Sequence, residues 1–155
     1  MDSEELYKKL KTFFSKKNDL MRHLDINACW EYIITETTIE EKDIKLRYYL
    51  IKKNESALEM SKSKPGITPD LILFFTEKAI LDMIEGNPSV EEYYERYHKV
   101  MNNPQPGIEV DNKINKARLK LWQIGYKKWQ KDFSKGYYWW KLSYYKSLFS
   151  KGNYY

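Results

Sequence analysis

Few residues of this chain could do acid–base, metal or nucleophilic chemistry, because it has only two histidines and one cysteine. Glu95 and His98 have the Glu-x-x-His spacing that puts two side chains on one face of a helix. Carboxylate-bridged di-metal centres use this spacing, but they need a second copy and two further glutamates. His23 has Leu20 three residues before it, so the chain holds no second copy. We therefore expect Glu95 and His98 to lie on a solvated helix face.

Cys29 and the acidic clusters give no stronger indication of an enzyme. Cys29 precedes Trp30 in a predicted strand and has no neighbouring base, so we expect a small buried hydrophobe. The carboxylates within 40–43 and 91–95 suit a loop and a solvated helix face better than a general acid–base pair. The glycines are too scattered for a phosphate-binding loop. The sequence therefore predicts a protein that is not an enzyme and has no catalytic residue, cofactor or metal.

A basic aromatic segment at the C-terminus is the strongest indication of binding. Residues 113–155 contain eleven lysines and arginines, a single acid, Asp132, and 13 of the 25 aromatic residues. Residues 1–112 carry 16 basic and 21 acidic residues, so positive charge is concentrated in the last part of the chain. Basic charge interleaved with Trp and Tyr suits a lipid surface, an amphiphile or single-stranded nucleic acid.

The hydrophobic patterning predicts one α+β domain at residues 1–133 and a tail at 134–155. Asp2 precedes the first helix as a cap, and Ser89 caps a later one, each with a glutamate three residues on. Helices are expected over residues 3–17, 77–85, 89–101 and 115–133, and strands over 28–36, 44–53, 56–61, 70–76 and 108–114. This order predicts an approximately five-stranded, mostly antiparallel sheet covered by helices, with a helical C-terminal tail.

Composition indicates a folded protein in a reducing compartment. Hydrophobic residues make up 42% of the chain and aromatic residues 16%, which is too apolar for a disordered protein. A single cysteine excludes an intramolecular disulfide. The N-terminus lacks an apolar run of the signal-peptide type, and the apolar run at 71–75 is far shorter than the roughly 20 residues that span a bilayer. We therefore expect a cytoplasmic location.

One stretch of the chain carries a recognisable order of motifs. Asp-Leu-Ile-Leu-Phe-Phe at 70–75 leads into a predicted helix at 77–84, which is followed by Gly-Asn-Pro at 86–88. The next helix bears the paired aromatics Tyr93 and Tyr94. This order resembles the sterol carrier protein type 2 superfamily.

The N-terminal helix and Trp30 in the first strand also fit the resemblance, which covers roughly residues 3–133. One departure concerns the region after the aromatic pair. The family usually continues with a Gly-Lys strand of alternating Leu and Ile, whereas this chain stays helical and delays strand-like character to 108–114. The position of the fifth strand and the shape of any cavity therefore cannot be taken from the family.

The resemblance implies an apolar tunnel between sheet and helices that binds, and transfers, a fatty acid, acyl-CoA or sterol-like ligand. The candidate lining residues are Ile72, Phe74, Leu81, Ile84, Tyr94, Tyr97, Trp122 and Trp129. Apolar stripes at strand and helix spacing are also the ordinary content of a filled core, so a tunnel and a filled core both remain open. The resemblance implies no catalytic residue.

The tail has three alternative roles. It packs on the domain or on a second subunit in a homo-oligomer, or it lies in a membrane interface, or it binds single-stranded nucleic acid. The candidate membrane or partner contacts are Trp139, Trp140, Lys141, Tyr145, Lys146 and Phe149. Nucleic acid is disfavoured because residues 1–112 are acidic. The sequence thus predicts a lipid-binding protein, with a nucleic-acid-binding or protein-interaction module as the alternative.

Overall fold

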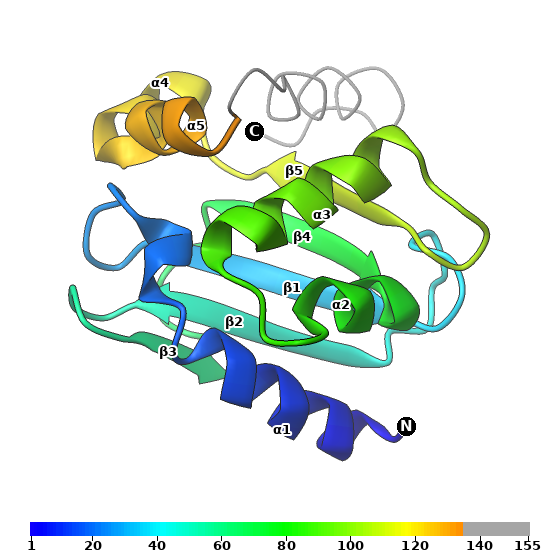
Figure 1. The fold of residues 1–155 in the computed structure, drawn as a ribbon. Helices are drawn as coiled ribbons and strands as arrows, with labels where there is room; N and C mark the ends of the chain where they lie inside the picture. Colours follow the sequence, from blue (N-terminus) through cyan, green and yellow to red (C-terminus); the bar gives the residue numbers. More distant parts are fainter. Residues whose placement is uncertain (135–155) are drawn as a thin grey trace.

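The protein has an α+β fold in which helices cover one face of a five-stranded sheet (Figure 1). The computed structural model describes residues 1–134. The strands are β1 (Cys29–Thr35), β2 (Leu46–Lys52), β3 (Leu58–Ser61), β4 (Leu71–Thr76) and β5 (Val110–Ile114). The helices are α1 (Ser3–Phe14), α2 (Glu77–Ile84), α3 (Val90–Asn102), α4 (Arg118–Leu121) and α5 (Lys127–Ser134), with a 3-10 turn at Asn18–Met21 and a π-helical turn at Trp122–Tyr126.

The sheet is mixed, with the strand order β3-β2-β1-β4-β5. β1 lies at its centre and pairs antiparallel with β2 and parallel with β4. The two outer pairings, β2 with β3 and β4 with β5, are antiparallel. The predicted class is confirmed, because three of the four pairings are antiparallel and all five expected strands are present.

The helix starts follow the predicted caps. The Asp2 carboxylate accepts a hydrogen bond from the Glu5 backbone N–H at 2.9 Å, and the Ser89 hydroxyl accepts one from the Glu92 N–H at 3.2 Å. Each bond satisfies a backbone donor that has no partner within its own helix. Both predicted caps are confirmed, and they fix where α1 and α3 begin against the sheet.

Alternation along the strands divides the sheet into two unlike faces. Tyr32 faces the helices and stacks between Tyr48, at 4.6 Å between ring centroids, and Phe75, at 5.8 Å. Phe14 of α1 packs on Tyr32 at 5.4 Å and is fully buried. The opposite face is less covered, and on β4 Ile72 and Phe74 are only half-buried. The large aromatic core therefore lies on the helix side of the sheet.

The predicted continuous helix over 115–133 is wrong, because it is broken in its middle. Ile124 and Gly125 leave helical geometry, and Gly125 has φ +111°. A Cβ at Gly125 would lie 2.1 Å from the backbone oxygen of His23, so only glycine permits this close approach. The break rotates α4 relative to α5, which leaves Leu119 67% exposed while the α5 residue Trp129 is buried.

The expectation of a solvated face at His98 is also wrong. His98 is 1% exposed, and its Nε2 lies 3.0 Å from the carbonyl oxygen of Phe133, which accepts the hydrogen bond. Glu95, three residues earlier, is exposed, so the pair does not share an environment. Burial holds the pKa of His98 below its ordinary value, so the ring is neutral inside the fold.

Two remaining expectations concern membranes and the tail. Among residues 1–134, no helix has the length and apolar character needed to cross a bilayer. The tail predicted at 134–155 lies outside the described residues, apart from Ser134 at the end of α5. The six candidate contact residues of that tail, Trp139 to Phe149, therefore stay predictions.

Candidate ligand-binding site

A small cavity lies between the sheet and the helices α3 and α5. Its volume is about 20 Å³, which is room for one body the size of a water molecule. Its wall is formed by side chains of β1, β4, α3 and α5, all of them apolar or aromatic: Trp30, Tyr32, Leu71, Leu73, Phe75, Tyr93, Tyr94, Tyr97 and Trp129. The residues that line it carry no charge, so the site suits an uncharged apolar group.

The polar atoms of the aromatic wall have partners within the fold. Tyr94 Oη and Trp129 Nε1 both donate to the Leu20 carbonyl oxygen at 2.8 Å. The Tyr97 hydroxyl accepts a hydrogen bond from Asn112 Nδ2 at 2.7 Å. Burial raises the pKa of Tyr94 and Tyr97 well above the ordinary value, so both phenols remain neutral at physiological pH. These bonds fix the ring orientations and leave ring faces and edges to form the wall.

The structure brings together three of the eight predicted ligand-binding residues. Tyr94 and Tyr97 of α3 and Trp129 of α5 line the cavity. The next two, Ile84 and Leu81 on α2, belong to the core or pack against it without lining the cavity.

The other three predicted residues lie elsewhere. Ile72 and Phe74 belong to the half-buried positions of β4, and Phe74 carries the Lys113 ammonium group over its ring at 4.7 Å. Trp122 lies in the π-helical turn beside α4, half-buried. Leu71, Leu73 and Phe75 of β4 line the cavity instead. Successive side chains of a strand point to opposite faces of the sheet, so the predicted residues of β4 lie on the face away from the cavity.

Sequence reasoning missed six lining residues, and for most of them a signal was available. Tyr93 precedes Tyr97 by four residues, a spacing that places both on one side of a helix. Tyr32 follows Trp30 by two residues in β1, so both face the same side of the sheet. For β4 the signal was ambiguous, because residues 71–75 are all apolar and either parity fits.

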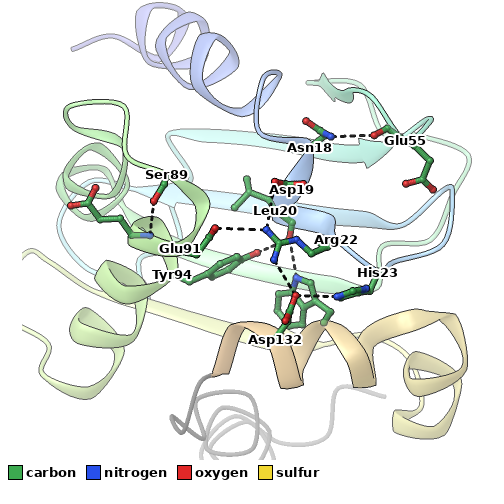
Figure 2. Close-up of polar contacts among 12 residues, drawn as sticks. Asn18, Asp19, Leu20, Arg22, His23, Glu55, Ser89, Glu91, Tyr94 and Asp132 are labelled. Carbon is green, nitrogen blue, oxygen red and sulfur yellow. Dashed lines mark hydrogen bonds and ion pairs between the residues drawn. The ribbon is translucent and has the colours of Figure 1, made fainter.

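Helix α5 closes the site and is held by polar contacts to the segment after α1 (Figure 2). Asp132 accepts hydrogen bonds from Arg22 Nη1 and from His23 Nε2, each at 3.0 Å. The Arg22 guanidinium also lies 4.9 Å from the Phe133 ring centroid. These donors hold the pKa of Asp132 below its ordinary value, so the carboxylate is charged at neutral pH.

A second group of polar contacts, which we call the Asp70 joint, is centred on buried Asp70 next to the π-helical turn. Its carboxylate accepts hydrogen bonds from Tyr126 Oη at 2.7 Å and from the Cys29 backbone N–H at 3.3 Å, and it pairs with Lys116. Tyr126 in turn accepts a hydrogen bond from Trp30 Nε1 at 2.8 Å. The joint connects the chain after β5 to the ends of β1 and β4, beside the cavity.

Cys29 lies in this joint with the character expected of it. It is fully buried, and burial together with the Asp70 charge raises the pKa of its thiol to about 12. A thiol with this pKa is protonated at neutral pH and is a poor nucleophile. Within residues 1–134, no cluster of three or more His, Cys, Asp or Glu side chains is arranged to hold a metal ion.

Comparison with known proteins adds no family to this picture. No model of a known protein family matches the chain, and no curated protein matches it. The resemblance to the sterol carrier protein type 2 superfamily therefore stays a prediction.

Proposed function

We propose that the protein binds a lipid, acyl or sterol-like molecule and transfers it to other acceptors, and that the apolar part of this molecule enters between the sheet and the helices α3 and α5. The observation that carries the proposal is the cavity at that place, with a wall of uncharged aromatic and aliphatic side chains. Three residues that the family resemblance implied as ligand contacts, Tyr94, Tyr97 and Trp129, meet there. The five-stranded sheet with helices over one face is the architecture that the same resemblance implied.

The size of the cavity makes the proposal specific about mechanism. Pockets for ligands of this class have volumes of roughly 300–1,000 Å³, whereas this cavity has about 20 Å³. Binding of such a ligand therefore requires that the wall opens. α5 is the element proposed to move, and opening would break the hydrogen bonds that Trp129, Phe133 and Asp132 make to Leu20, His98 and Arg22.

The test is native mass spectrometry of the purified full chain, followed by organic extraction and lipid analysis. The proposal predicts an added mass at near-stoichiometric level that the extract identifies as an acyl, sterol or isoprenoid species. A chain of bare mass that also takes up no fluorescent fatty acid would contradict it.

The second candidate is a binding module with a filled core that acts through its surface. The volume of the cavity favours it, because a space of about 20 Å³ is common in an ordinary core. So does the charge of residues 113–131, which include seven lysines and arginines and no acid. A bare chain in the mass spectrum, together with tight binding to a polyanion that salt abolishes, would favour this candidate over the first.

A further inference from the structure

One end of the molecule exposes apolar side chains among lysines. We call it the basic end and define it as Ile26, Lys116, Leu119, Lys120, Trp122 and Lys127. Leu119 is 67% exposed and Ile26 is 44% exposed. They come from two segments distant in sequence, the loop before β1 and the helix α4. In Figure 1, α4 lies at the outer corner of the molecule.

The two segments are fixed to each other by backbone contacts. The Asp25 N–H donates to the carbonyl oxygen of Ile124 at 3.1 Å, and Gly125 lies directly against the backbone of His23. The ion pair with Asp70 holds the Lys116 side chain in place. The backbone that carries the exposed side chains of the basic end is therefore held in place by these contacts.

A groove of about 190 Å³ runs between these segments. Its apolar lining comes from Ile26, Ile67 and Ile124, and its cations are Lys116 and Lys120. Lys116 pairs with Asp70, while Lys120 is exposed at the groove. The lining also contains Asp25 and Asp70, and Asp70 already pairs with Lys116, so Lys120 is the cation of the groove that can meet an anionic group joined to an apolar body.

The groove lining has two lysines and two aspartates, so the excess of positive charge at this end comes from the neighbouring helix. Lys127, Lys128 and Lys131 are exposed on the following helix. Asp25 lies at the groove, and Asp132 is already bonded to Arg22 and to the neighbouring histidine. The net field at this end is positive, and it attracts an anionic surface.

We propose that the basic end docks on the surface of a bilayer that contains anionic phospholipid. Leu119 and Ile26 enter the headgroup layer, and Lys120 at the groove meets a lipid phosphate. Trp122 lies at the depth where tryptophan is favoured in membranes. The residues of this site are different from the tail residues that the sequence predicts to contact a membrane.

A bilayer fits this end better than single-stranded nucleic acid does. Nucleic acid would need open aromatic faces for stacking. The Trp122 ring instead has the Arg118 guanidinium 4.7 Å and the Lys127 ammonium 5.5 Å from its centroid. Exposed aliphatic side chains such as Leu119 gain little from bases and much from the headgroup region. The proposal does not depend on the internal cavity, because a filled core would leave this surface unchanged.

The test is co-sedimentation of the full chain with vesicles of phosphatidylcholine alone or with 30% phosphatidylserine. The variant is Leu119→Gln with Lys120→Glu, and the control is Ile44→Gln with Lys42→Glu. Both double variants replace one exposed apolar side chain and one exposed lysine, since Ile44 is 41% exposed. All four positions are exposed, so both variants are expected to fold, and thermal unfolding checks this.

The proposal predicts tighter binding to the vesicles that contain phosphatidylserine. It also predicts a loss of about tenfold or more in that binding for the Leu119 and Lys120 variant, but not for the control. Equal binding by the wild type and this variant would overturn the proposal. So would an equal loss in both variants, or a loss that appears for a single-stranded oligonucleotide and not for vesicles. Lipid found inside the purified chain is measured separately, so failure of the cavity proposal stays distinguishable.

Discussion

The helices α1 and α5 both pack on the same aromatic core, but different forces hold them. α1 inserts Phe14 between the rings of Tyr32, Tyr48 and Tyr93, at centroid distances of 5.4 to 6.1 Å. α5 has a buried face too, yet it is also hydrogen-bonded to two other parts of the chain, the segment after α1 through Leu20 and Arg22, and α3 through His98. Apolar packing depends little on pH, whereas hydrogen bonds to titratable groups depend on it strongly. The difference makes α5 the part of the helix layer that solution conditions can loosen.

The largest expected effect is on the α1 side. Phe14→Ala removes a fully buried ring and leaves a cavity, so we expect the free energy of unfolding to fall by about 4 kcal/mol. The loss should be the same between pH 5.5 and pH 8, because no titratable group changes its partner. Urea denaturation at several pH values measures it. A loss below about 1.5 kcal/mol would mean that α1 is not held by packing.

On the α5 side, the largest effect is expected at the break in the helix. Gly125→Ala places a Cβ against the His23 carbonyl oxygen in a backbone conformation with φ +111°, so a loss of about 3 kcal/mol is expected. Gly66→Ala is the matched control, because a Cβ there meets nothing within 4 Å, and its effect should stay within about 0.5 kcal/mol. Chemical denaturation of the two variants should therefore separate them clearly, and similar values would contradict the described contact.

A smaller effect is expected from pH at His98. Burial lowers the pKa of this histidine in the folded state, so the unfolded chain binds a proton first as pH falls. Its contribution to stability is therefore present above the ordinary pKa of about 6.5 and is lost as pH falls through the lowered pKa, by about 1.4 kcal/mol for each unit of lowering. His98→Gln should flatten the stability curve between pH 7.5 and pH 5. An unchanged slope would show that His98 does not link α5 to pH.

The smallest effect is expected at Asp132. Hydrogen bonds from Arg22 and His23 lower the pKa of this carboxyl, so its stabilising contribution is present above pH 4 to 5 and is lost as pH falls through the lowered value. The side chains are 34–40% exposed, so Asp132→Asn should cost less than about 1 kcal/mol at pH 7. The difference in melting temperature between this variant and the wild type should shrink as pH falls below about 4. A difference that persists there would have another cause.

Much of the fold was predictable because its signals are local. Helix caps at Asp2 and Ser89 and the strand pattern near Trp30 depend on short-range chemistry that the sequence displays directly. The break at Gly125 was not predictable, because its cause is the backbone of His23, which is about a hundred residues away in the chain. The burial of His98 has the same kind of origin, since its partner is the Phe133 carbonyl on another helix.

The candidate site was predictable only in part. Tyr94, Tyr97 and Trp129, which the family resemblance implied, line the cavity. Leu81, Ile84 and Trp122, which also lie in predicted helices, do not line it. On β4 residues 71–75 are all apolar, so the sequence does not show whether the odd-numbered or the even-numbered side chains face the helices. The pairing of Leu73 with Tyr32 of β1 shows that the odd-numbered ones do. The volume of the cavity depends on how all of these side chains pack together, and no local pattern carries that information.

The measurement that tests the central claim most directly is titration of a fluorescent fatty acid against two single variants. Leu73→Phe enlarges a side chain that lines the cavity, and Ile72→Phe enlarges its neighbour, which does not line it. The account predicts that Leu73→Phe weakens uptake about tenfold or more at unchanged fold, while Ile72→Phe binds as the wild type does. Uptake that is equal in all three proteins, or absent from the wild type, would contradict binding between the sheet and α5.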